Sequence, residues 1–132
     1  MEFTLVIPIF LMLVSGMVDL GVGLDAYMTV ISATRDGARM GSNLCGTASP
    51  ACSSVVSTRV TTAAAAAGIT GGLTVLPLVC TTSAGAGTSC DSGGAKGGGS
   101  VTVTVTYTYR TIWPLAFGAT IPMTYTAKFV VL

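Results

Sequence analysis

Histidine is absent from the 132-residue sequence and charged side chains are scarce, with six Lys or Arg and five Asp or Glu giving a net charge of +1. Without histidine the chain lacks the commonest general base and metal ligand and cannot form a Ser–His or Cys–His nucleophile pair. The near-neutral charge, with no run of like charges, provides no electrostatic footprint for nucleic acid. We therefore expect no catalytic residues, no metal ligands, no cofactor and no nucleic-acid partner.

The residues that are present favour a folded protein with an apolar surface. Hydrophobic residues make up 51% of the chain, which also contains 20 Thr, 11 Ser and 17 Gly. Disordered chains have nearly the opposite composition, because they are rich in charged residues and poor in β-branched ones. A freely diffusing monomer with so few surface charges would be poorly soluble. Much of the surface is therefore predicted to face lipid or other protein.

The N-terminus carries the longest apolar run. Residues 3–18 contain no charged side chain over 16 positions. The helical periodicity then continues, which predicts one helix over about residues 2–40, with one backbone donor removed at Pro8 and the end at Gly41 and Ser42. Such a helix is about 58 Å long, enough to cross a bilayer. A secretory signal peptide fits less well, because no Lys or Arg precedes the run.

The rest of the chain predicts a second helix followed by strands. The second helix follows Ser53, its expected N-cap, and stops at Gly68. Residues 73–82 predict a strand, and Pro77 within it indicates a sheet edge. Residues 83–100 are rich in Gly and Ser and predict a loop.

Two segments near the C-terminus alternate strictly between apolar and polar residues. Residues 101–110 and 121–131 each place Val, Tyr or other apolar side chains on one face and mostly Thr on the other, as strands do. Between them, Trp113 and Phe117 could bind sugars, but burial between subunits is favoured. The predicted fold is α+β, with a long N-terminal apolar helix, a short second helix and a small antiparallel sheet. We divide it into a transmembrane or filament-core helix (1–41) and a globular head (42–132).

The four cysteines indicate an oxidising compartment. They allow three pairings, of which the local one, Cys45–Cys52 and Cys80–Cys90, is favoured because it closes short loops beside turn residues. A zinc site built from all four thiolates is less favoured, because the sequence has no C-x₂-C pair.

The charged residues of the long helix do not form a catalytic arrangement. Asp19 and Asp25 are six residues apart, which separates them by about 240° around a helix, so they cannot act as a carboxylate pair. They are either solvated at the outer end of a membrane segment or hydrogen-bonded between chains in a polymer. Asp36 and Arg39 are three apart and can form an ion pair. Gly37 either admits another chain closely or has no special role near the helix end.

Two motifs resemble TadE-like pseudopilins of the type IV pilin-like superfamily. They are EFTLVIPIFLMLVSGMVDLG at residues 2–21 and ATRDGAR at residues 33–39. The matching residues in them are Glu2, Phe3, Pro8, the segment from Gly16 to Gly21, and Arg35, Asp36, Gly37, Ala38 and Arg39. The resemblance implies one N-terminal helix followed by a second helix and a three-stranded sheet. It also implies processing by a prepilin peptidase, although the family usually has its glutamate fifth rather than second.

Glu2 has two interpretations. It is either an ordinary acidic residue at the positive end of a helix dipole or the partner of a neighbouring chain's terminal amine in a helical bundle. The second is favoured, because a carboxylate buried beside an apolar run requires a partner.

The function expected from these features is that of a structural pilin subunit. It would be held in the cytoplasmic membrane by its helix and then polymerise through that helix into an extracellular filament, a pilus. The resemblance implies an assembly ATPase and a membrane platform as partners. Two alternatives stay open: a minor pseudopilin that primes or tips a filament, and a single-pass, membrane-anchored binding module that does not polymerise.

Overall fold

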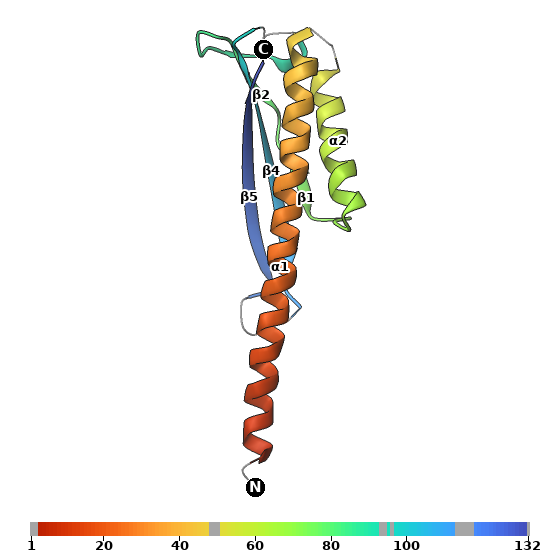
Figure 1. Ribbon diagram of the computed structural model, residues 1–132, viewed down its shortest axis with the longest axis vertical. Helices are drawn as coiled ribbons and strands as arrows, with labels where there is room; N and C mark the ends of the chain where they lie inside the picture. The colour runs from red at the N-terminus through yellow and green to blue at the C-terminus, as the bar shows by residue number, and fades with distance from the viewer. Residues whose placement is uncertain (1–2, 48–50, 93–94, 96, 113–117, 132) are drawn as a thin grey trace.

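A computed structural model describes residues 3–47, 51–92, 95, 97–112 and 118–131 (Figure 1). Over these residues the chain forms helices α1 (Phe3–Leu44) and α2 (Cys52–Ala66), strands β1 (Leu73–Val75), β2 (Val79–Thr81), β3 (Gly87–Thr88), β4 (Ser100–Arg110) and β5 (Thr120–Val130), and two 3₁₀ turns at Cys45–Thr47 and Cys90–Ser92. The predicted α+β class is confirmed. The division of the chain at residue 41 stays a prediction.

Helix α1 runs along the molecule from end to end, and only its C-terminal part lies beside the sheet and α2 (Figure 1). It continues through Pro8 and ends at Leu44, so the predicted end at Gly41 and Ser42 is wrong. Gly41 is buried, and a Cβ added there would lie 3.1 Å from Val101 Cγ1 and 3.4 Å from Val56 Cγ2. This glycine therefore allows β4 and α2 to approach the helix rather than ending it.

The sheet is built around β4. Strand β5 pairs with it antiparallel along its whole length, β1 and β2 share its other edge, and β3 pairs with β2. The register sets Val101 opposite Phe129 and Val105 opposite Tyr125. The apolar sides of both alternating segments therefore share the inner face, and the threonines share the outer face, as their alternation predicts.

The predicted strand at 73–82 is two strands, β1 and β2, separated at residues 76–78. The Leu76 N–H still donates to the Thr104 carbonyl at 2.9 Å, but Pro77 has no N–H and cannot continue the ladder. The predicted loop at 83–100 is also more ordered than expected, because it contains β3 and the 3₁₀ turn Cys90–Ser92.

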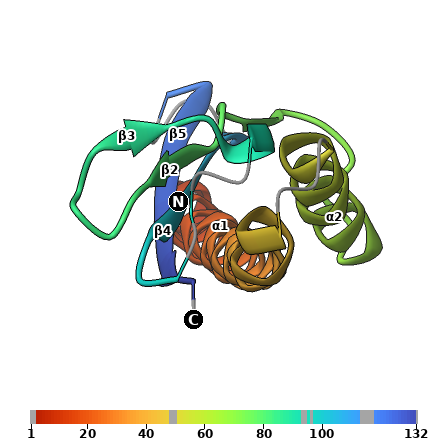
Figure 2. The same cartoon turned by 90° about the horizontal axis from the view of Figure 1, so that it is seen from above.

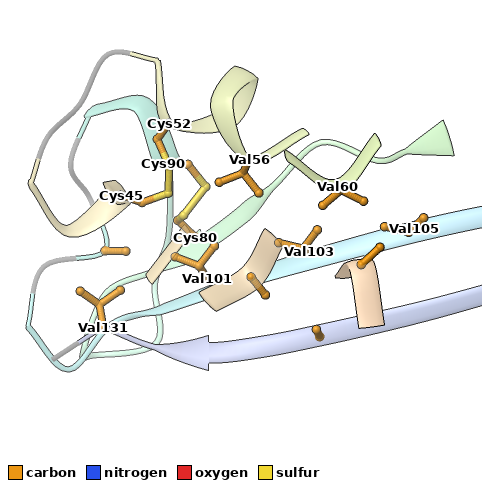
Figure 3. Close-up of a cluster of buried hydrophobic side chains, with 14 of the residues drawn as sticks. Cys45, Cys52, Val56, Val60, Cys80, Cys90, Val101, Val103, Val105 and Val131 are labelled. Atoms are coloured by element: carbon orange, nitrogen blue, oxygen red, sulfur yellow. A yellow bond between two sulfur atoms is a disulfide. The ribbon is translucent and has the colours of Figure 1, made fainter. Parts of the chain in front are cut away.

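The core of the head lies where both helices meet the sheet. Seen along the long axis, α1 lies beside the sheet and α2 packs against α1 on its other side (Figure 2). The core is made of small and medium-sized side chains together with both cystine bridges (Figure 3): Val30, Ala33 and Ala38 from α1, Val56, Val60 and Ala64 from α2, Val101, Val103 and Val105 from β4, Ala127 from β5, and Ala95 and Val131.

The N-terminus of α2 is capped from elsewhere in the chain. The helix begins at Cys52, so Ser53 is not its N-cap, and the N-cap residue Ala51 has no side-chain cap bond. Instead Asp91 accepts hydrogen bonds from the Ser53 N–H at 2.8 Å and from the Ser53 hydroxyl at 2.6 and 2.8 Å. These bonds hold the pKa of Asp91 below its ordinary value, and the bonds from the Ser53 hydroxyl have the larger effect. Gly68 ends the helix as predicted, with a φ of 91°.

Candidate assembly surface

Residues 3–18 of α1, which we call the bare segment, have large apolar side chains that are all exposed where their burial is described. The exposed fraction runs from 40% at Val14 to 81% at Phe3. Soluble monomers rarely expose a contiguous apolar patch of more than a few hundred Å². Within the described ranges, α1 is the one helix long and apolar enough to cross a membrane, judged by length and composition.

Asp19 marks the point where α1 meets the head. Its side chain is only 3% exposed, and its Oδ1 accepts hydrogen bonds from the Tyr109 hydroxyl at 2.7 Å and from the Ile112 N–H at 3.2 Å. The expected solvation of this residue is therefore wrong, and its bonding between chains stays a prediction. The end of β4 reaches this level of the helix, and Tyr109 and Ile112 take the place of water at Oδ1.

Tyr109 approaches α1 over a glycine. A Cβ added at Gly23 would lie 3.6 Å from the tyrosine ring, which leaves room for little more. Burial first, and then the hydrogen bond to Asp19 and its charge, raise the pKa of Tyr109 from 10.0 to about 12. The hydroxyl therefore stays protonated, and able to donate, well above neutral pH.

Beside this hydrogen bond lies a cavity of about 210 Å³, which we call the basal cavity. Its walls are largely apolar and come from α1 and from the ends of β4 and β5 next to the bare segment: Leu20, Gly23 and Leu24 on the helix, and Tyr109, Ile121 and Met123 on the strands. Two of its lining residues, Leu20 and Leu24, are exposed at the surface.

The motif at residues 35–39 joins α1 to the head. Asp36 forms its ion pair with Arg59 of α2, Oδ2 to Nε at 2.9 Å, so the expected pairing with Arg39 is wrong. The reason is that α2 places the guanidinium of Arg59 beside Asp36, at a partly exposed position. Asp36 therefore pairs across the two helices and not with Arg39 one turn away on its own helix. Arg35 donates to the Tyr125 hydroxyl of β5 at 3.1 Å.

Small residues of this motif fill the contact between the helices. A Cβ at Gly37 would collide with Cγ2 of Val60, so the chain that approaches this glycine is α2 of the same molecule. Ala38 is fully buried in the core. The motif therefore fixes the head to the helix.

The other predicted assembly residues lie on or near the bare segment. Gly21 is exposed and a Cβ there would meet nothing within 4 Å, Gly16 is half-buried, and Asp25 is exposed. Pro8 lies inside the continuous helix. Glu2, Trp113 and Phe117 lie outside the described residues. The structure does not bring Pro8, Gly16, Gly21 and Asp25 into one site within a single chain.

The disulfides join Cys45 to Cys52 and Cys80 to Cys90, with Cα atoms 5.4 and 5.2 Å apart. This is the favoured local pairing, and it leaves no thiolate for the alternative zinc site. The first bridge links the 3₁₀ turn directly after α1 to the start of α2, and the second links β2 to the 3₁₀ turn that carries Asp91.

Sequence reasoning missed three functional contacts: Tyr109 with Asp19, Gly23 beneath Tyr109, and Arg59 with Asp36. One sequence feature could have found Gly23, because it follows Asp19 by four residues and so lies on the same helix face. No comparable feature identifies Tyr109, which is 90 residues away from Asp19.

The fold and surface define a class of protein: a disulfide-bonded α+β head carried on a helix whose other half is apolar and bare. Residues 1–39 match the family model described as TadE-like protein, which confirms the resemblance seen in the two N-terminal motifs. That family is pilus-related and structural rather than enzymatic. A search of curated proteins and a search of solved structures gave no match.

Proposed function

We propose that this chain is a structural pilin subunit that polymerises through the bare segment into an extracellular filament. Before assembly the same segment holds the subunit in the cytoplasmic membrane. The observation that supports this proposal is the exposure of large apolar side chains along one half of a helix whose other half is packed into a folded head.

The exposed area is large enough for more than one neighbour. Fifteen large apolar side chains between Phe3 and Met28 are exposed, and at roughly 100 Å² each they present on the order of 1,500 Å². A standard interface buries about 800 Å² on each partner. About two copies can therefore pack on one helix, which is what a filament core requires.

The continuity of α1 argues for an anchor rather than a removable signal sequence. The helix passes without a break from the bare segment into the head, and Asp19 lies hydrogen-bonded to Tyr109 and Ile112 just after it. The apolar window is also mostly exposed, unlike the core helix of a soluble protein. Because the same helix forms part of the folded head, it is expected to stay in the protein after membrane insertion.

Leaving the membrane gains little hydrophobic free energy, because lipid tails are as apolar as the side chains of a neighbouring helix. Packing must then favour assembly, and the exposed Gly21 permits close approach of a second helix. We propose an assembly ATPase and a membrane platform as partners that supply the work, and a prepilin peptidase that processes the precursor. A head-to-tail contact that does not close produces a helical polymer.

Electron microscopy and mass spectrometry of sheared surface material test this function. We expect filaments in which this chain is the most abundant protein, and their loss in a Leu13→Asp variant that still reaches the membrane fraction. A chain present only in trace amounts beside another subunit would make it a minor pseudopilin. Abundant chain in the membrane with no filament would favour the binding module instead.

A further inference from the structure

The basal cavity has the size of one aromatic side chain. A dry engineered cavity of about 150 Å³ binds benzene, so a cavity of 210 Å³ accepts a benzyl group with room for its attachment. Its walls are largely apolar, and two of the residues that line it, Leu20 and Leu24, are 61% and 56% exposed. When an apolar side chain enters the cavity, its apolar neighbours can therefore pack against Leu20 and Leu24.

Two aromatic side chains in the described part of the chain are exposed enough to serve as that group. They are Phe3 and Phe10, at 81% and 63%, and both belong to the bare segment. The basal cavity lies at the level of residues 19–27 of α1, so neither can reach the cavity of its own chain along a continuous helix. If the occupant is one of these two described side chains, it therefore comes from a second copy.

Charge distinguishes the two candidates. The cavity is bordered by Asp19, whose carboxylate is buried. Phe3 follows Glu2 directly, so its entry would bring a second carboxylate toward Asp19, and like charges in a poorly solvated site are costly. Phe10 is flanked by Ile9 and Leu11 and brings no charge with it.

We propose that the basal cavity binds Phe10 of a second copy of this chain. The inference rests on the proposed filament function and specifies one of its contacts. The apolar side chains one turn from Phe10, Val6 and Val14, then cover the rim at Leu20 and Leu24. Placing Phe10 beside residues 20–24 offsets the two parallel helices by about 12 residues, or about 18 Å.

Engineered cysteines test this contact in intact filaments. All four native cysteines are in disulfides, so an added pair reports without background from free thiols. Full-length chains carrying Phe10→Cys and Leu24→Cys are assembled with an equal amount of wild-type chain, so that substituted chains are often neighbours, and the filaments are sheared from the cell and oxidised. The matched control carries Phe3→Cys and Leu24→Cys, with its first cysteine seven residues, or about 10 Å, further along the helix.

We expect covalent dimers and higher multimers from the Phe10→Cys pair, at least tenfold more than from the Phe3→Cys pair, because a disulfide needs Cβ atoms about 3.5–4.5 Å apart. Filaments that form but give no cross-link at position 10, as when a lipid chain fills the cavity, would overturn the inference. Equal or stronger cross-linking from position 3 would also overturn it. If wild-type chain forms no filament at all, the proposed function itself fails.

A second measurement does not depend on oxidation. Phe10→Ala is expected to reduce the filament yield at least tenfold, and Phe10→Leu to restore most of it, because leucine refills the cavity. Phe3→Ala should reduce the yield less than Phe10→Ala. Equal losses from the two alanine variants would contradict a specific role for Phe10.

Discussion

The two halves of α1 differ in their surroundings, because one packs a face against the head and the other is bare. The buried half presents small residues to the head: Ala33, Thr34, Gly37, Ala38 and Gly41. The bare half carries Phe, Leu, Ile and Met at most positions. Small side chains let α2 and β4 approach the helix axis, whereas large ones are suited to lipid or to other large side chains. Residue size therefore separates the two environments better than hydrophobicity does.

The largest effect is expected from a glycine exchange in the buried half. Gly37→Val places a branched side chain against Val60, and overpacking of this kind costs about 3 kcal/mol of unfolding free energy. The measurement is chemical denaturation of the full chain in detergent. The control is Gly21→Val in open space, which should change stability by less than about 0.5 kcal/mol. Equal effects at the two sites would mean that close packing against Val60 does not distinguish Gly37 from an open position of the same helix.

The junction between the halves is tested by Tyr109→Phe. This change removes the hydroxyl that donates to buried Asp19 and should cost about 2 kcal/mol, measured by the same denaturation. Tyr107→Phe, on the same strand face, is the matched control and should cost less. A loss from Tyr107→Phe as large as that from Tyr109→Phe would argue against a specific Asp19 contact.

The stability difference between the wild type and Tyr109→Phe should also depend on pH. Because the pKa of Tyr109 is raised from 10.0 to about 12 in the folded protein, its contribution to stability is complete below pH 10 and falls as the pH rises to 12. The stability difference between wild type and Tyr109→Phe should therefore shrink over that interval. A difference that stays constant from pH 9 to pH 12 would contradict the assignment.

A smaller effect is expected at the start of α2. Asp91→Ala removes the acceptor of the Ser53 bonds and should lower the melting temperature by less than Tyr109→Phe does. Since the pKa of Asp91 is held below 3.8, its contribution is present above that pH and is lost as the pH falls through the lowered value. The wild type and the variant should have the same melting temperature in strong acid. A difference in melting temperature that persists there would contradict the role of Asp91 in capping α2.

The smallest effect concerns the ion pair between Asp36 and Arg59, which are 46% and 52% exposed. A double-mutant cycle with alanine at both positions should give a coupling of about 0.2–1 kcal/mol, because water screens an exposed pair. The same cycle between Asp36 and Arg39 should give a coupling near zero. The reverse ranking would mean that the helix prefers its internal pair in solution.

The fold was largely predictable from local patterns, and the contacts at the junction were not. The alternation in residues 101–110 fixed a strand and its buried face, because side chains in a strand point to opposite faces in turn. The end of α1 was mispredicted at Gly41, because close packing against Val101 gives glycine a second role that no local pattern reveals. Asp19 was wrongly expected to be solvated, because its donors come from residues 109 and 112, which only the tertiary fold brings near.

The central claim is that copies of the chain shelter the bare segment outside the membrane. Cysteine labelling of lipid-free filaments tests it directly, with Leu13→Cys in the bare segment and Ser54→Cys on the exposed side of α2 as the reference. We predict that a water-soluble maleimide modifies position 54 but not position 13 in filaments, and modifies both after dissociation by denaturant. Full labelling at position 13 in intact, lipid-free material would contradict the account.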